Sequence, residues 1–163
     1  VKHQCQPEVT GFSFAGLAEA SPNPRILQVL AQDELDAIVI CPSNPFVSID
    51  PILQLPGLWE ALRDCDAPVL AVSPIVAGMA IKGPAAKMMA ELGMPASAEA
   101  VAAHYQEAYP GLIECFVIDA SDDTLSSSIE KLGMATAVTN TVMKTDEDKR
   151  KLAADILQMA ASR

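Results

Sequence analysis

Short apolar segments alternate with segments of helical periodicity along this chain, and that alternation constrains the fold more than any other feature. We predict strands in five segments, residues 9–14, 37–40, 68–72, 113–118 and 135–138. The helix-patterned segments are residues 24–32, 56–63, 84–92, 97–108 and 124–132, with a last helix capped by Thr145. This alternation is typical of an α/β fold, here a Rossmann-like, mostly parallel sheet with helices on both faces.

The composition fits one domain with an aliphatic core. The chain has 163 residues, of which 50% are hydrophobic but only 4% are aromatic. Its formal charge is −10, from 21 acidic and 11 basic residues. This charge argues against nucleic acid or an anionic membrane surface as a partner, because both need clustered Lys and Arg. One small anionic ligand is still compatible with it, since such a ligand needs only local donors.

The cysteines indicate a reduced, cytoplasmic protein. They are Cys5, Cys41, Cys65 and Cys115, far apart and without a C-x-x-C pair. A metal site built from them with His3 or His104 is the weaker alternative, because no ligand spacing supports it. The longest apolar run, residues 67–81, contains Pro74 and is shorter than the roughly 20 residues that span a bilayer. No signal peptide is visible, so we predict a cytoplasmic location.

The segment at residues 41–53 follows an apolar strand and is rich in proline and polar side chains. Proline restricts the backbone and biases the residue before it toward extended geometry, so we expect Asn44 and Asp50 to be non-helical. The result would be a stiff loop from which Ser43, Asn44 and Ser48 point outward. Ligands bind at the carboxyl ends of strands in open α/β sheets, so we favour a functional loop over a plain turn.

Two later strand ends carry similar loops. Ser73-Pro74 directly follows the strand at residues 68–72, and a polar loop at residues 139–141 follows the last strand. The carboxyl ends of parallel strands meet at one edge of a sheet. We therefore expect these loops to line one side of a cleft together with residues 41–53.

Charged residues at two helix starts leave alternatives open. The Lys-Gly-Pro stretch at residues 82–84 could cradle an anion, but a solvated Lys beside an ordinary helix cap explains it equally well. Three acids, Asp119, Asp122 and Asp123, could bind a metal. Acids that complement a helix dipole are the commoner reason for such a cluster.

Other side chains of functional type are expected only to pack. Trp59 is the single tryptophan, and large aromatic side chains usually just bury area. His104 stands alone among Ala residues, where a packed or surface histidine is commoner than a catalytic one. In the first predicted helix, Ile26, Leu27 and Leu30 mark one apolar face.

The loops also carry a longer pattern that resembles a known family. Residues 42–53 read Pro-Ser-Asn-Pro-x-x-Ser-Ile-x-Pro-Ile-Leu. Residues 72–85 read Val-Ser-Pro-Ile-Val-x-Gly-x-Ala-x-Lys-Gly-Pro-Ala, and shorter blocks follow at residues 89–93, 101–105, 117–119 and 139–143. In this order and over nearly the whole chain, the blocks are similar to the 2-phospho-L-lactate transferase family of coenzyme F-420 biosynthesis. Asn140 departs from the pattern, because many members have Asp there.

The resemblance covers only the C-terminal half of the family's longer members. It implies that residues 1–163 are the C-terminal portion of a single larger domain. No Gly-rich phosphate loop is present in this sequence. The N-terminal half would supply that loop and the acidic residues associated with the metal and the deazaflavin, so we expect the isolated fragment to be inactive.

The activity that the resemblance implies is transfer of a substituted phosphate group. A 2-phospholactyl or related phosphoenolpyruvyl group would move from a guanylyl diphosphate donor to the deazaflavin FO, and GMP would leave. The implied partners are the guanine nucleotide and FO, with Mg²⁺ as cofactor of the full-length enzyme and no nucleic acid or membrane. Formation of a homodimer is a further possibility that the sequence leaves open.

The nucleotide-binding residues implied on this chain are Ser43, Asn44, Pro45, Ser48, Ser73, Lys82 and Gly83. No residue here is a convincing nucleophile or general base, so the catalytic residues are left unassigned. We expect Asn44→Ala to weaken nucleotide binding and to leave the melting temperature nearly unchanged.

Two other functions stay open. A non-catalytic, nucleotide-binding regulatory protein of the gluconeogenesis-factor type would share the fold, although the Ser43-Asn44-Pro45 triplet favours the enzyme. Alternatively, the isolated chain binds nothing and is only a stable piece of sheet. Titration with GDP and Mg²⁺ separates these hypotheses.

Overall fold

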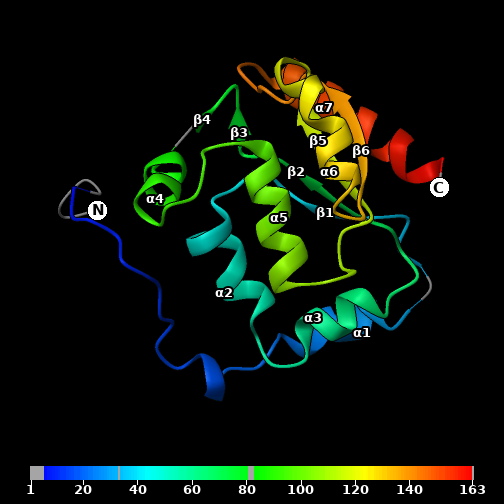
Figure 1. Ribbon diagram of the computed structural model, residues 1–163. Coiled ribbons are helices and arrows are strands. Elements are labelled where there is room, and N and C mark those ends of the chain that lie inside the picture. Colours follow the sequence, from blue (N-terminus) through cyan, green and yellow to red (C-terminus); the bar gives the residue numbers. More distant parts are fainter. Residues whose placement is uncertain (1–5, 33, 81–82, 163) are drawn as a thin grey trace.

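The computed structural model describes residues 6–32, 34–80 and 83–162, which form a parallel sheet with helices on both faces (Figure 1). The strands of that sheet are β1 (Ile38–Ile40), β2 (Val69–Val72), β5 (Cys115–Asp119) and β6 (Ala135–Thr139). They lie in the order β1-β2-β5-β6, and each neighbouring pair is parallel. The structure thus confirms the predicted α/β class.

The remaining elements connect these strands along the chain. The helices are α1 (Pro24–Leu30), α2 (Asp50–Leu53), α3 (Leu58–Arg63), α4 (Ala85–Glu91), α5 (Ala98–Ala108), α6 (Ser126–Glu130) and α7 (Asp146–Ala161). The shorter elements are the 3-10 turns η1 (Leu17–Glu19) and η3 (Ala120–Leu125), the π-helical turn η2 (Pro45–Ile49), and an antiparallel hairpin of β3 (Ile75–Val76) and β4 (Met79–Ala80).

Side-chain caps explain where the two longest helices begin. The Ser97 hydroxyl accepts a hydrogen bond from the Ala100 N–H at 3.1 Å and caps α5. At the start of α7, Thr145 and Asp148 each accept a hydrogen bond from the other's backbone N–H and form a capping box. Both helix starts agree with the sequence prediction.

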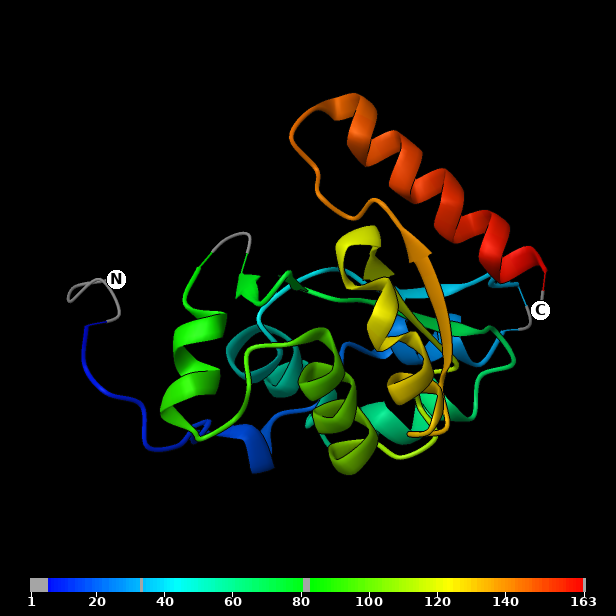
Figure 2. The ribbon, with the colours of Figure 1, turned by 45° about the horizontal axis from the view of Figure 1, so that its top comes forward.

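Successive side chains of the strands point to opposite faces of the sheet and build two cores. On one face, Ala71 and Phe116 belong to the same core cluster as Val101 of α5. On the other face, Leu70 and Val117 cluster with side chains of α7. Figure 2 shows α7 on one side of the sheet and α5 on the other. Helices therefore cover both faces, as predicted.

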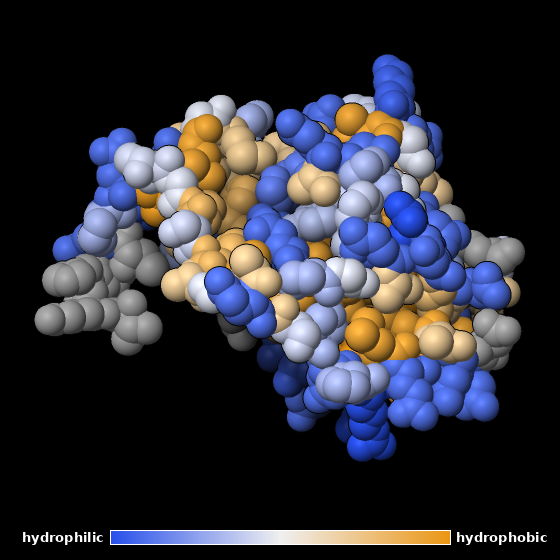
Figure 3. All heavy atoms as spheres, turned by 90° about the horizontal axis from the view of Figure 1, so that it is seen from below, coloured by the Kyte–Doolittle hydropathy of each residue, from blue (hydrophilic) through white to orange (hydrophobic). Residues whose placement is uncertain are grey.

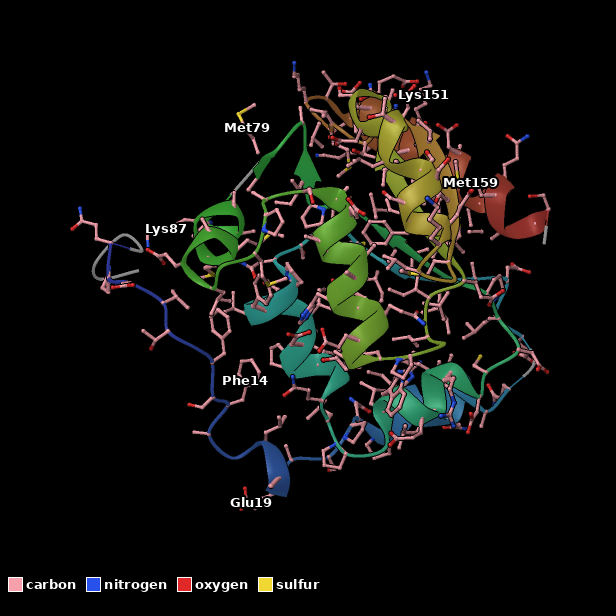
Figure 4. All side chains as sticks on the ribbon, in the orientation of Figure 1. Phe14, Glu19, Met79, Lys87, Lys151 and Met159 are labelled. Atoms are coloured by element: carbon pink, nitrogen blue, oxygen red, sulfur yellow. The ribbon has the colours of Figure 1, made fainter. Side chains whose placement is uncertain are left out.

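Residues 9–14 form no strand, which corrects the sequence prediction. Instead, Phe12 stacks on Phe46 of η2 with the ring centroids 5.6 Å apart. Figure 4 shows Lys87 of α4 pointing toward this N-terminal segment, and its Nζ donates to the Pro7 carbonyl at 3.0 Å. Side-chain contacts thus hold this segment, which pairs with none of the strands in the described ranges.

The apolar face of α1 is only partly buried. Leu30 is buried and Leu27 half-buried, but Ile26 is 49% and Val29 is 38% exposed. Figure 3, the view from below, shows apolar surface gathered among hydrophilic side chains on the side of the molecule where α1 lies. Ile26, which the sequence placed on one apolar face with the other two, therefore faces outward.

Residues 45–53 are helical, which corrects the prediction of a stiff extended loop. Asp50 has helical dihedral angles, φ −51° and ψ −45°, and its N–H donates to the Pro45 carbonyl. Its buried carboxylate accepts hydrogen bonds from the side chains of His104 and Tyr109. These contacts outweigh the bias that Pro51 imposes on the residue before it. Asn44 is extended, as predicted.

Candidate functional site

A cavity of about 230 Å³ lies where the loops after β1, β2 and β6 meet. It is lined by Pro42, Ser43, Asn44, Ser73, Pro74, Val76, Thr141, Met143 and Lys149. The structure thus brings Ser43 and Asn44 of the first loop together with Ser73 of the second. The cavity lies at the edge of the sheet where open α/β folds bind ligands. That these three residues bind a nucleotide stays a prediction.

Ser73 builds the wall of the cavity instead of offering a free hydroxyl. Its buried Oγ donates to the Ile75 carbonyl at 2.9 Å and accepts from the Ile75 N–H at 3.2 Å. The Ser73 N–H donates to the Val117 carbonyl at 2.9 Å and links the end of β2 to β5. Ser73 therefore fixes the turn that leads into the β3–β4 hairpin.

Asn44 caps the turn η2 from the edge of the cavity. Its Oδ1 accepts hydrogen bonds from the Phe46 N–H at 3.0 Å and the Val47 N–H at 3.2 Å, and its Nδ2 donates to Met88 Sδ at 3.2 Å. The prediction that the Asn44 side chain is free to point outward is therefore wrong. The first N–H groups of a helical turn lack partners within the turn and need an acceptor such as this one.

Ser43 offers the free hydroxyl of the cavity. Its side chain is half-buried beside Asn44, and its Oγ has no hydrogen-bond partner within the described part of the chain. A hydroxyl both donates and accepts hydrogen bonds. Ser43 is therefore suited to contact a ribose hydroxyl or a phosphate oxygen.

The other predicted site residues do not line this cavity. Pro45 is buried in η2, Ser48 is exposed on the same turn, and Gly83 is exposed ahead of α4. Lys82 lies outside the described residues, so the structure does not place the suggested anion cradle. The N-cap of α4 is Pro84, and Gly83 precedes it with a φ of +75°.

Thr141 lines the cavity, as expected for its loop, although it was not among the predicted nucleotide-binding residues. Its N–H and Oγ1 donate to Asp119 Oδ2 at 2.9 and 3.3 Å, and the Ser121 N–H and Oγ donate to Oδ1 at 3.0 and 2.8 Å. Burial opposes charge on Asp119, but these hydrogen bonds outweigh burial and lower its pKa. An ionised Asp119 therefore holds the loop after β6 against the end of β5. The polar loop at residues 139–141 was the only sequence signal.

Lys149 is the one charged side chain among the described residues that line the cavity. It lies near the start of α7, and its Nζ donates to Asp146 Oδ1 at 2.8 Å. Both side chains are exposed, and exposed ion pairs contribute little stability. The ammonium group can therefore exchange Asp146 for an anionic ligand. No sequence pattern pointed to Lys149, because only the tertiary fold decides which helix faces the cavity.

The acids near the end of β5 have structural partners. Both oxygens of the buried Asp122 accept from the Ala77 N–H, at 3.0 and 3.2 Å. Asp119 caps η3 by accepting from the Ser121 N–H. No group of three metal-ligating side chains comes together within the described ranges. The contact with Ser121 favours the interpretation of Asp119 as a helix-terminal group, whereas Asp122 holds the turn between β3 and β4.

An apolar groove of about 350 Å³ adjoins the cavity and shares Pro42, Met143 and Lys149 with it. The rest of its lining is Val39, Cys41, Val72, Leu152, Ala153, Ile156 and Leu157. Val39 of the edge strand β1 is 38% exposed and Leu157 of α7 is 57% exposed. The surface next to the cavity therefore includes exposed apolar side chains.

Comparison with known proteins shows the family. The sequence matches the family model described as 2-phospho-L-lactate transferase CofD over residues 1–160, so the chain belongs to this family. It is 38% identical to the 2-phospho-L-lactate transferase of Methanosarcina barkeri over 148 residues, an alignment that covers 91% of this chain and 45% of that protein. It is 37% identical over 145 residues to the phosphoenolpyruvate transferase of Kitasatospora aureofaciens, covering 89% and 44%. The chain thus spans about half the length of the curated relatives it matches.

A solved structure supports the fold. The model superposes with a TM-score of 0.56 on a member of the UPF0052 family from Bacillus halodurans, at 15% sequence identity. The match covers 82% of this chain and 46% of that one. At this identity the likeness concerns the fold alone.

Proposed function

We propose that this chain is the nucleotide-binding portion of an enzyme that transfers a 2-phospholactyl, or a related phosphoenolpyruvyl, group. The donor would be a guanylyl diphosphate ester, the acceptor the deazaflavin FO, and the product a precursor of coenzyme F-420. Family membership and the names of the relatives support the class of reaction. The single observation that carries the proposal is the cavity at the strand ends, with the free Ser43 hydroxyl and the Lys149 ammonium group at its wall.

The cavity offers the two kinds of group that a nucleoside diphosphate requires. The Ser43 hydroxyl can donate to a ribose or phosphate oxygen, and Lys149 can leave Asp146 to pair with phosphate charge. Ser73 and Asn44 hold the walls through their own hydrogen bonds. In the transfer, an FO hydroxyl would attack the phosphorus that bears the lactyl group, and GMP would leave. Such a reaction needs alignment and charge stabilisation more than covalent help.

The described residues do not by themselves make a complete site for this reaction. No carboxylate is among the described residues that line the cavity, and Mg²⁺ would need ligands from outside them. We therefore assign no step to Mg²⁺ on this chain. Residues 1–163 would be the C-terminal portion of a larger domain, and the catalytic acids and metal ligands would come from the other portion.

The cellular setting belongs to the same proposal. Among the described residues, no helix has the length and apolar character needed to cross a bilayer. Cys41 and Cys65 are free thiols, which suits a reducing compartment. With the net charge of −10, these thiols support a cytoplasmic enzyme that acts on small molecules.

Calorimetric titration with GDP, with and without Mg²⁺, tests the binding part of this proposal. Ser43→Ala should weaken GDP binding about tenfold, the usual loss for a hydrogen bond to a charged group. Ser48→Ala is the matched control, because Ser48 is exposed and does not line the cavity. Equal losses in both variants would contradict the assignment of this cavity as the nucleotide site.

A transfer assay with the longer protein tests the chemical part. Incubation with the guanylyl diphosphate donor and FO should release GMP and yield the phosphodiester of FO. GDP binding without any product from FO would identify a non-catalytic nucleotide-binding protein instead. Binding by the longer protein but not by this chain would support a site divided between two portions of the domain.

A further inference from the structure

A buried carboxylate lies at the end of the turn η2, whose N-cap, Asn44, lines the cavity. Asp50 is 6% exposed, and its two carboxylate oxygens lie 3.1 and 3.0 Å from His104 Nε2. Its Oδ1 also accepts a hydrogen bond from the Tyr109 hydroxyl at 3.1 Å. None of the three residues is among those that line the cavity. The function proposed above does not account for this cluster.

The cluster ties the turn η2 to α5. Asp50 directly follows η2, and its N–H donates to the Pro45 carbonyl at the start of that turn. His104 lies in α5, and Tyr109 is the C-cap of that helix. Burial raises the pKa of Tyr109, so its hydroxyl keeps the proton that it donates. One carboxylate thus joins the turn to His104 and Tyr109, which lie 54 and 59 positions further along the chain.

Aromatic contacts reinforce this link. Phe46 of the turn is 3% exposed and meets the His104 ring edge-on, with the centroids 5.0 Å apart and the planes at 63°. Phe12 of the N-terminal segment stacks on Phe46 with an interplanar angle of 10°. The turn is therefore held by stacked rings as well as by the carboxylate of Asp50.

The position of the turn decides where the cavity residues lie. The N–H groups of Phe46 and Val47 both donate to Asn44 Oδ1, so Asn44 moves with the turn. Ser43, with the free hydroxyl, precedes Asn44 directly. A shift of η2 would therefore displace the group to which we assign the ligand contact.

We propose that Asp50 and His104 are positioning residues for nucleotide binding, because their contact holds η2 where it sets Ser43 and Asn44 in the cavity. For its ligand, a nucleoside diphosphate, this inference rests on the proposed function. The pair touches no ligand itself and acts through the turn.

Variants of the pair, made in the longer protein so that both portions of the domain are present, test the inference. Asp50→Asn and His104→Ala should each weaken GDP binding about tenfold in calorimetric titration. His104→Gln should bind GDP more tightly than His104→Ala, because the glutamine amide N–H can replace the ring N–H as a donor to Asp50. The double variant Asp50→Asn/His104→Ala should have about the same GDP affinity as the single variant that binds GDP more weakly, since both changes remove the same interaction.

Amide hydrogen exchange provides a readout that does not depend on the ligand. Exchange at Phe46 and Val47 should accelerate in Asp50→Asn and His104→Ala, while Leu70 in the sheet keeps its rate. Ile129→Val is the matched control. Ile129 is fully buried in the same core as Phe46 but takes part in none of the hydrogen bonds or ring contacts of Asp50 and His104. This variant should lower stability and leave both the GDP affinity and the exchange at the turn unchanged.

The outcomes separate this inference from the function on which it rests. Wild-type GDP affinity and exchange in Asp50→Asn and His104→Ala would overturn it, and so would equal effects in Ile129→Val. If the unaltered chain and the longer protein both bind no GDP, the proposed function fails. In that case unchanged exchange at Phe46 and Val47 would still refute the positioning role.

Discussion

The loops after β1 and β2 begin alike and do different things. Each places proline next to serine shortly after a strand of the sheet, Pro42-Ser43 after β1 and Ser73-Pro74 after β2. Ser73 is 1% exposed and both hydrogen-bonding roles of its hydroxyl are used by Ile75. Ser43 is half-buried and has no partner within the described residues.

The position of each strand in the sheet explains this difference. β2 lies between β1 and β5, so the chain that leaves it is enclosed on both sides. β1 is an edge strand, and the chain that leaves it borders the open cavity and groove. A similar pair of residues thus builds a wall at the centre of the sheet and offers a contact at its edge.

The largest expected effect separates the two serines directly. Ser73→Ala leaves the N–H and the carbonyl of Ile75 without their side-chain partner in a buried turn, and should cost about 2 kcal/mol of unfolding free energy. Ser43→Ala should stay within about 0.5 kcal/mol of the wild type, as surface changes usually do. Urea denaturation measures both. Similar losses in the two variants would remove the distinction between wall and contact.

Asn44→Ala should have the next largest effect. The change removes the cap of η2 and should cost about 1 kcal/mol of unfolding free energy, in addition to any loss of GDP affinity. Asn44→Asp, which keeps the acceptor oxygen, should restore most of the stability. From the sequence alone the melting temperature would be expected to stay nearly unchanged, so calorimetric melting of the variant decides between the two expectations.

A third strand end extends the comparison through pH. Hydrogen bonds lower the pKa of Asp119 below its usual value, so its contribution to stability is complete above that value and is lost as the pH falls through the lowered pKa. The stability difference between the wild type and Asp119→Asn should therefore shrink between about pH 5 and pH 2. Urea titrations across that range measure it. A difference that does not change with pH would mean that the carboxylate charge is not what holds Thr141.

The smallest expected effect concerns the cation at the cavity. Lys149→Ala should weaken GDP binding up to about fivefold, and less at high salt, because an exposed cation contributes little in water. Lys151→Ala is the control on the same helix, and Lys151 does not line the cavity. Titration at two salt concentrations measures both variants. Identical affinities would exclude Lys149 as a phosphate contact.

The sequence predicted most of the sheet and only part of the site. The strands β1, β2, β5 and β6 were found because short apolar runs between turn residues are a local signal. The prediction of a strand at residues 9–14 was wrong, because alternation of apolar and polar residues says nothing about whether a partner strand is present. The helical geometry of Asp50 was missed because His104 and Tyr109, which hold it, are far away in the sequence.

The site residues divide in the same way. Ser43, Asn44 and Ser73 stand next to strand ends, so the local pattern found them, although it could not tell which hydroxyl is free. Thr141 and Lys149 join them only because β6 and α7 come to the same end of the sheet. Lys82, the cation that the sequence favoured, lies outside the described residues.

The place of the single tryptophan makes this chain convenient to observe. The Trp59 ring lies 6.4 Å from the ring of Tyr109, and the Arg63 guanidinium lies 5.4 Å above it. Tyr109 in turn donates to Asp50. The intrinsic fluorescence of one indole can therefore follow, without any attached dye, how tightly α5 and the turn beneath the cavity stay joined.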